Sequence, residues 1–205
     1  MVKKKPKLEF RYYEIEPNEQ VLALLGENWR RSYGKDIDKL HFHNYMEVGI
    51  CYEGHGESIL RNSVKIFEKG SIIIVPPNYP HSNSADFGTT AYWEWLYLDI
   101  DSVLQDMKEL SFSKLDISYM RNALYESALF FHQDEYRKIS NIILKIRDEC
   151  DRKAYMYRES LKGLLQSFVV ELLRIRNVQE DMPKKSSRNF QIAPALSYVK
   201  DHYNE

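Results

Sequence analysis

Cysteines, long apolar runs and net charge are all scarce in this 205-residue chain. No segment reaches the roughly 18 to 20 consecutive apolar residues of a membrane span, so we expect no membrane partner. The two cysteines, Cys51 and Cys150, match neither a disulfide framework nor a metal-binding spacing, so the cytoplasm is the expected compartment. A formal net charge of -1 argues against a nucleic-acid surface spread over the whole chain. With 43% hydrophobic and 29% charged residues, the composition is that of an ordinary globular protein.

Glycine is nearly absent from the second half of the sequence. After Ile100 only Gly163 remains, whereas before it apolar runs of strand length alternate with turn signals such as Gly54, Gly56 and the Pro-Pro-Asn at 76–78. Short strands rich in Ile, Val, Tyr and Trp, closely spaced by turns, are typical of an all-β sandwich or barrel. The sequence therefore predicts antiparallel β structure from Tyr45 to about Ile100.

A helical period replaces the strand pattern after Ile100. Apolar residues at spacings of three and four predict two amphipathic helices, joined by a polar turn at 151–154 into an antiparallel hairpin. The first stripe is Tyr136, Ile139, Ile143, Ile146 and Cys150, and the second is Leu161, Leu165, Phe168, Leu172 and Ile175. Both stripes could pack on the barrel. Alternatively, part of the second stripe (Leu161, Leu165, Phe168 and Leu172) meets its copy in another subunit and forms a homodimer.

The last part of the sequence predicts a linker followed by a new helix. The stretch NVQEDMPKKSSRN is polar and contains a proline and a serine pair. A helix then begins in IAPALSYVKDHYNE, with Pro194 suited to its first turn. It has nothing against which to bury its apolar face, so we expect the sequence to be the front part of a longer protein.

The stretch LHFHNYMEVGICYEG sets two histidines and a carboxylate among apolar residues. In a strand, residues two apart share a face, which groups His41, His43, Tyr45 and Glu47. With His81 from a later hairpin, they offer imidazole and carboxylate ligands that suit zinc, nickel, manganese or iron(II). The same residues also suit a polar patch that hydrogen-bonds a ligand's hydroxyl groups. The spacing permits a metal site but does not require one.

Two further features are candidates for ligand contact. Trp93 and Trp95 share one strand face while Glu94 lies on the other, and either face could line a barrel. The tryptophan rings could stack on a sugar, or they could belong to the core or to an interface. Arg30 precedes the first histidine motif and could grip a carboxylate or phosphate on a ligand, although it could equally be a solvated arginine.

The spacing His41-x-His43-x3-Glu47-x6-Gly54, followed by Gly70-x5-Pro76-x4-His81, resembles the paired motifs of the cupin superfamily. The resemblance implies an α+β fold, an antiparallel cupin (jelly-roll) β-barrel followed by the helical hairpin, with the His and Glu side chains inside. The family's glycine after the proline is Asn78 here, and its asparagine after the last histidine is Ala85. Many cupin barrels keep these residues as pocket lining, so the implication for metal is weaker.

The stretch GSIIIVPPNYPHSNSADFGTTAYWEWLYLDI, the hairpin and the last fourteen residues together look like the sensor half of an AraC-type (AraC/XylS) transcription regulator. In that family a cupin barrel binds a small effector, helices after it dimerise, and C-terminal helix-turn-helix motifs read DNA. The resemblance runs from about Phe10 to Glu205. It implies an N-terminal arm at 1–19, a barrel at 20–101, a helical dimerisation region at 102–178, a linker at 179–190 and the start of a DNA-binding domain at 191–205.

We therefore expect an effector-sensing and dimerisation part of a transcription regulator, with no catalysis and no resident cofactor. It would bind a small polar molecule such as a sugar and reach DNA through a C-terminal domain that this sequence lacks. The competing hypothesis is a metal-dependent cupin enzyme, an isomerase or dioxygenase, with a divalent transition ion on the three histidines and Glu47. The expected ligand-binding residues are His41, His43, Glu47, His81, Tyr45, Trp93, Trp95 and Arg30.

Overall fold

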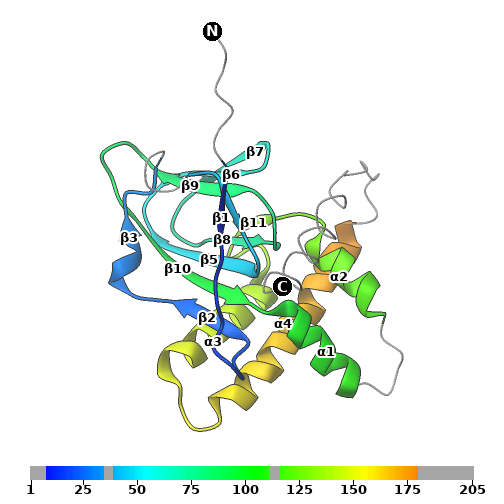
Figure 1. Ribbon diagram of the computed structural model, residues 1–205. Helices are drawn as coiled ribbons and strands as arrows, with labels where there is room; N and C mark the ends of the chain where they lie inside the picture. Colours follow the sequence, from blue (N-terminus) through cyan, green and yellow to red (C-terminus); the bar gives the residue numbers. More distant parts are fainter. Residues whose placement is uncertain (1–7, 35–38, 111–115, 180–205) are drawn as a thin grey trace, which may run out of the picture.

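The computed structural model describes residues 8–34, 39–110 and 116–179, which form two facing β-sheets and a layer of helices (Figure 1). The chain is still helical at residues 177–179, where the linker was expected to begin, so its start is corrected; the rest of the linker and the expected helix that begins near Pro194 lie outside the described residues. Both stay predictions, as do the domain boundaries drawn from the sequence. None of the described helices combines the length and the apolar character needed to cross a bilayer.

The first sheet has five strands in the order β1-β4-β9-β6-β7. Its neighbours are antiparallel except for β1, which runs parallel to β4. The turn from β6 to β7 falls at Arg61 and Asn62, and Arg61 has a φ of 55°. The strands are β1 (Glu9–Arg11), β4 (His41–His43), β9 (His81–Ala85), β6 (Gly56–Leu60) and β7 (Ser63–Phe67).

The second sheet runs β11-β8-β5-β10-β2, and the short strand β3 pairs with β10 beside it. Nearly every residue of β5 and all of β8 are buried, because this sheet has the barrel interior on one face and helices on the other. The elements are β2 (Val21–Leu24), the 3-10 helix η1 (Glu27–Trp29), β3 (Arg30–Arg31), β5 (Met46–Glu53), β8 (Ser71–Val75), β10 (Ala91–Leu98) and β11 (Leu129–His132).

Strand β11 lies in a region where the sequence predicted only helix. It pairs antiparallel with β8, with Leu129 opposite Ile74. This strand has only four residues, whose burial alternates. A pattern this short cannot be distinguished in the sequence from the helical segments on either side. The chain thus returns once to the barrel before the helical hairpin begins.

The interior of the barrel is filled by side chains from both sheets. Trp93, Trp95 and Tyr97 of β10 point into it, which decides between the two faces that the sequence left open. Gly49 is required beside them, since a Cβ at this position would lie 2.3 Å from the Trp95 ring and 2.7 Å from Ile73. The other buried apolar residues of this interior are Tyr33, Cys51, Leu60, Phe67, Ile73, Val75, Ala85 and Ala91.

Helices cover the outer face of the second sheet (Figure 1). The predicted helical hairpin is present as α3 (Arg137–Arg152) and α4 (Tyr157–Gln179), preceded by α1 (Ile100–Leu110) and α2 (Ile117–Tyr125). The turn between α3 and α4 contains two positive φ angles, 43° at Lys153 and 62° at Met156. The fold is therefore α+β, a cupin-like barrel followed by a helical hairpin, as the sequence predicts.

The four residues assigned to a dimer interface are packed inside this single chain. Leu161 is 5% exposed, and Leu165, Phe168 and Leu172 are fully buried in the core between the second sheet and the helices. A side chain with almost no exposed surface cannot contact a second subunit, so this assignment is corrected. The apolar spacing along a helix is the same whether it faces its own barrel or a partner, which is why the sequence left both alternatives open.

Candidate functional site

His41, His43, Glu47 and His81 converge inside the barrel. One ligand-capable atom of each lies within 4.8 Å of the others, and none of the four residues is more than 3% exposed. His41 of β4 lies directly opposite His81 of β9 in the first sheet, while Glu47 comes from β5 in the second sheet. The structure therefore brings together all four residues of the predicted cluster.

The path of the chain through the cluster differs from the expected single strand. The strand that carries both histidines ends at His43, and β5 begins only at Met46. The chain crosses from one sheet to the other at Asn44 and Tyr45. The side chain of Tyr45 packs against the edge of the barrel interior, so its contribution to the cluster is its carbonyl, which contacts His43.

Each imidazole of the cluster is held by a backbone carbonyl two residues away. A carbonyl oxygen only accepts hydrogen bonds, so the Nδ1 atom that contacts it carries the proton. In a neutral ring, Nε2 is then the nitrogen able to accept a hydrogen bond or bind an ion, whereas in a ring protonated on both nitrogens Nε2 donates to a neighbouring carboxylate. The contacts are His41 with Lys39 at 2.8 Å, His43 with Tyr45 at 2.9 Å and His81 with Tyr79 at 2.9 Å.

Glu47 lies between two of these imidazoles. Its Oε2 is 3.0 Å from His43 Nε2, and its Oε1 is 3.2 Å from His81 Nε2. Neither His43 Nε2 nor Glu47 Oε1 makes a hydrogen bond of acceptable geometry with a described residue, although both atoms are buried. Burial alone raises the pKa of the Glu47 carboxyl, but the His81 and His43 imidazoles outweigh it and hold this pKa well below its ordinary value. The carboxylate is thus ionised at neutral pH.

His41 completes the cluster as a neutral imidazole. Burial lowers its pKa to about 3, and the neighbouring His81 adds to this effect while Glu47 opposes it. At neutral pH the ring therefore carries a lone pair instead of a charge. A neutral imidazole and an ionised carboxylate are the forms in which these side chains bind a metal ion or accept hydrogen bonds from a ligand.

Two tyrosines cover the cluster, and the sequence singled out neither as a site residue. Tyr13 stacks on Tyr97 with ring centroids 3.9 Å apart, and both rings meet His43 edge-on. Asn44 holds Tyr13 in place, because its Oδ1 accepts from the Tyr13 backbone N–H at 3.0 Å and its Nδ2 donates to the Tyr13 carbonyl at 2.9 Å. Tyr97 could have been found from the face that it shares with Trp93 and Trp95. Nothing in the sequence near Tyr13 indicates this contact.

Trp93 and Trp95 lie deeper in the barrel interior. Their rings are stacked, with centroids 5.0 Å apart and planes at 9°, and Trp93 meets Phe67 edge-on. Trp95 Nε1 donates to the Tyr33 hydroxyl at 3.3 Å. Trp93 Nε1 has no hydrogen-bond partner within residues 8–34, 39–110 and 116–179, although the side chain is fully buried. The barrel interior therefore offers a hydrogen-bond donor besides the histidine cluster.

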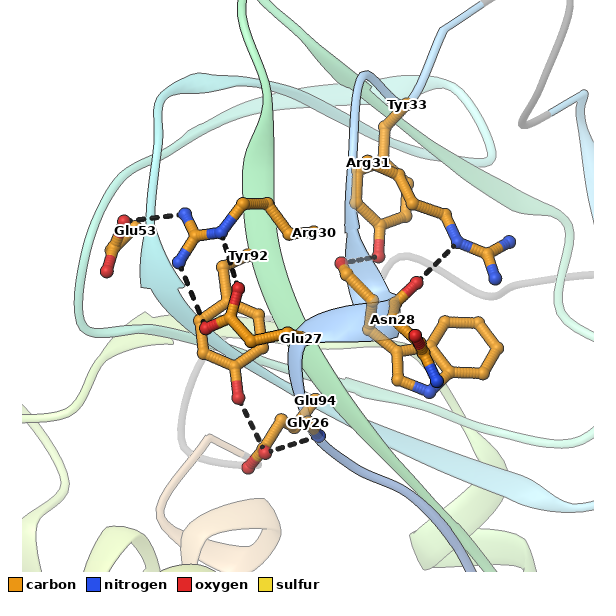
Figure 2. Close-up of polar contacts among 10 residues, drawn as sticks. Gly26, Glu27, Asn28, Arg30, Arg31, Tyr33, Glu53, Tyr92 and Glu94 are labelled. Atoms are coloured by element: carbon orange, nitrogen blue, oxygen red, sulfur yellow. Dashed lines mark hydrogen bonds and ion pairs between the residues drawn. The ribbon is translucent and has the colours of Figure 1, made fainter.

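Arg30, the remaining predicted site residue, does not join the cluster. Its guanidinium pairs with Glu53 at 2.6 Å and with Glu27 at 2.8 Å, and it lies 5.0 Å from the centroid of the Tyr92 ring. Figure 2 shows these ion pairs on the segment from Gly26 to Tyr33, beside β10. The positive charge of Arg30 is thus matched by two carboxylates at the surface.

A second buried carboxylate, Glu94, faces the helices from the same strand as the tryptophans. Arg147 of α3 donates to both of its oxygens, at 2.7 and 3.1 Å. The Gly26 N–H and the Tyr92 hydroxyl add contacts of 2.9 and 2.8 Å (Figure 2). Burial raises the pKa of Glu94, but Arg147, Gly26 and Tyr92 outweigh it and lower this pKa to about 2. The strand pattern of the sequence predicts Glu94 on the face opposite the tryptophans but indicates no role for it.

Comparison with known proteins agrees with this architecture. Residues 30–167 match the family model described as "AraC-like ligand binding domain". Among curated proteins none matches. A structure of ToxT from Vibrio cholerae aligns with a TM-score of 0.56 at 14% identity, over 91% of this chain and 67% of ToxT. A structure of ToxT with a bound unsaturated fatty acid aligns with a TM-score of 0.51 at 11% identity, over 91% of this chain and 63% of ToxT.

A third structure is that of CuxR, described as an AraC-like transcriptional activator. It aligns with a TM-score of 0.47 at 12% identity, over 78% of this chain and 52% of CuxR. The chain thus spans between half and two thirds of the length of CuxR and ToxT. At these identities, the ToxT alignments show a shared fold.

Proposed function

The chain belongs to the family of AraC-like ligand-binding domains, and on that premise we propose that it is the effector-sensing part of a DNA-binding transcription regulator. A small polar molecule would bind in the barrel at the cluster of His41, His43, Glu47 and His81; since these side chains are at most 3% exposed, its entry requires covering side chains such as Tyr13 to move aside. The supporting observation is the burial of an ionised carboxylate among three imidazoles. Buried polar groups are costly unless they have partners, and convergent polar groups in an apolar barrel mark a ligand site. DNA contact would come from a domain beyond the described residues.

A hydroxyl-rich molecule such as a carbohydrate fits these groups. Sugar hydroxyls can donate to Glu47, and they can accept a hydrogen bond from the unpartnered Trp93 N–H. The neighbour ToxT, which shares the fold, has been solved with an unsaturated fatty acid, so the fold takes small organic molecules in at least one regulator. For this chain we propose the polar ligand, because the described interior holds histidines and a carboxylate.

A thermal-shift screen of mono- and disaccharides and of sugar acids tests the effector proposal. We expect at least one compound to raise the melting temperature saturably, since a ligand that binds only the folded state stabilises it. Glu47→Gln should lose this response and Trp93→Phe should weaken it. Glu53→Gln is the matched control, because Glu53 is an exposed carboxylate that pairs with Arg30. A response that Glu47→Gln retains in full would place the ligand elsewhere.

We propose further that the cluster holds a divalent transition ion. Ligand atoms about 2.1 Å from one ion lie about 3.0 to 3.4 Å apart. The two contacts of Glu47 with the histidines measure 3.0 and 3.2 Å, while the four candidate ligand atoms spread up to 4.8 Å, so an ion would have to draw the side chains closer together. Each Nδ1 is held by a carbonyl, the usual arrangement for a metal-binding histidine. Three imidazoles and one carboxylate suit zinc, nickel, manganese or iron(II). A bound ion would supply open positions for oxygen atoms of the effector.

Metal analysis of the purified protein tests this second proposal. The protein is loaded with metal and desalted, and its metal content is then measured by elemental mass spectrometry. We expect about one ion per chain in the unmodified protein and much less in His43→Gln and Glu47→Gln. His55→Gln is the control, since His55 is exposed and pairs with Asp86. An equal metal content in all three variants would contradict the proposal. The metal proposal does not include catalysis. The competing enzyme hypothesis requires a catalytic turnover that is lost in His43→Gln and Glu47→Gln.

We propose finally that the regulator is a homodimer. Because Leu161, Leu165, Phe168 and Leu172 are buried in the core, the contact must use other surface residues. Leu164 and Leu173 of α4 are only half-buried and widen the stripe toward the surface. The molar masses of Leu164→Glu and of the unmodified protein, measured by light scattering, test whether this surface forms the dimer. We expect a dimer for the unmodified protein and a monomer for the variant.

A further inference from the structure

Arg176 is a buried guanidinium without a carboxylate partner among the described residues. It lies near the C-terminal end of α4 and is 4% exposed. One terminal nitrogen donates to Ser127 Oγ at 2.8 Å, and the other donates to the Ser127 carbonyl. Its Nε, which is also buried, has no hydrogen-bond partner in the described part of the chain. Of the described residues, only the neutral Ser127, in the loop before β11, hydrogen-bonds the cation.

Other arginines of the same helical layer are paired with acids. Arg147 binds the buried Glu94, and even the exposed Arg174, two residues before Arg176, lies 3.1 Å from Glu171. Arginine is rarely buried without a compensating negative charge, because it loses its hydration. The surroundings of Arg176 therefore favour an anion more strongly than those of its neighbours.

Two further groups face the guanidinium from other elements. Burial lowers the pKa of Arg176, while the exposed Glu126 carboxylate and the Tyr79 hydroxyl raise it, so both groups lie within electrostatic reach. Glu126 nevertheless makes no ion pair with Arg176. Tyr79 belongs to the loop between β8 and β9, and its carbonyl holds the ring of His81. The environment of Arg176 thus joins the end of α4 to the loop that positions one histidine of the barrel cluster.

We propose that Arg176 and Ser127 form a second ligand site, which binds a carboxylate or phosphate group of a small molecule where α4 meets the barrel. The Nε–H and an unused terminal N–H lie on one edge of the guanidinium and offer two parallel donors, the arrangement that such anions accept in pairs. Ser127 accepts from both terminal nitrogens through its hydroxyl and carbonyl oxygens, which fixes the guanidinium and leaves this Nε edge for the anion. This site lies outside the barrel interior and does not depend on the effector proposal.

Anion titrations of the 205-residue chain test the site. Melting temperature and calorimetric binding are measured with inorganic phosphate and, separately, with butyrate, against sodium chloride at equal ionic strength. We expect a saturable response to at least one probe, and the stronger response identifies the anion class. Arg176→Met should abolish it, and Arg176→Lys, which keeps the charge but not the paired donors, should weaken binding at least about tenfold. Arg174→Gln on the same helix should respond as the unmodified chain does.

The controls separate this site from a purely structural arginine. If neither anion gives a saturable response, or if Arg176→Met responds like the unmodified chain, the proposal is overturned. Should Arg176→Met fail to fold, the comparison with Arg176→Lys decides, since equal binding by the lysine variant contradicts paired recognition. Glu126→Gln removes a nearby competing carboxylate and should strengthen anion binding. Weaker anion binding in that variant would count against the site.

Discussion

Glu94 and Arg147 join the barrel to the helical hairpin through two parallel contacts of 2.7 and 3.1 Å. The Glu94 carboxylate is fully buried, while the neighbouring residues Trp93 and Trp95 on the same strand point into the barrel interior. One strand therefore faces the candidate ligand site with one side and holds α3 with the other. A ligand that shifts β10 would act on the helices through this ion pair.

Replacing Glu94 tests the strength of this connection. Glu94→Gln leaves the partly buried Arg147 without its buried acid partner, so the free energy of unfolding should fall by about 1 to 3 kcal/mol. Urea unfolding at pH 7 measures the change. Glu53→Gln removes an exposed ion pair with Arg30 and should cost at most about 0.5 kcal/mol. Equal losses in the two variants would mean that the buried pair does not stabilise the fold.

The same carboxylate predicts a pH dependence. Its pKa is lowered from 4.5 to about 2 in the folded chain. A lowered pKa means that the folded state holds the proton less tightly than the unfolded state, so the stability from Glu94 is complete above pH 4.5 and is lost as the pH falls toward 2. Between pH 5 and pH 3, the free energy of unfolding should fall more steeply in the unmodified protein than in Glu94→Gln. Parallel slopes in urea unfolding would contradict this.

The close approach of Trp95 to Gly49 predicts a cost for any larger residue. A Cβ at Gly49 would lie 2.3 Å from the Trp95 ring, so Gly49→Ala should lower the free energy of unfolding by about 1 to 3 kcal/mol. Gly163→Ala is the matched control, because a Cβ at Gly163 in α4 meets nothing within 4 Å. It should stabilise the protein by about 0.5 to 1 kcal/mol through helix propensity. Thermal or urea unfolding should show a lower free energy of unfolding for Gly49→Ala and a higher one for Gly163→Ala. Changes of the same sign would contradict the packing described.

The burial of Leu165 predicts a loss of stability with no change in assembly. Leu165→Ala removes a fully buried side chain from the core and should cost about 2 to 5 kcal/mol. Light scattering of the variant, under conditions where it is folded, should give the same mass as the unmodified protein. A change in mass without a loss of stability would return Leu165 to a subunit interface.

Much of the fold and of the histidine cluster could be predicted from the sequence because the relevant signals are local. Strand periodicity grouped the residues of the first motif, and the resemblance of two spaced motifs to those of the cupin superfamily predicted that His41, His43, Glu47 and His81 meet inside one barrel. Relations between distant elements were not predicted, since contacts such as Glu94 with Arg147 depend on how the helices dock on the sheet. The same holds for Tyr13, whose stacking on Tyr97 is set by one asparagine, Asn44.

The apolar stripe of α4 shows a different limit. Its spacing correctly predicts a helix with one buried face, and α4 is present. The spacing carries no information about which surface covers that face, so the assignment of Leu161, Leu165, Phe168 and Leu172 to a dimer required three-dimensional contacts to correct.

The most direct measurement is effector-dependent DNA binding by a protein that continues past Glu205. Selection from a random DNA library would define the site, and titration with and without the compound from the thermal-shift screen would give the coupling. The effector should change the DNA affinity by at least about fivefold, while Glu47→Gln should bind the same DNA and not respond to the effector. No sequence-specific binding, or an undiminished response in Glu47→Gln, would contradict effector sensing at the barrel cluster.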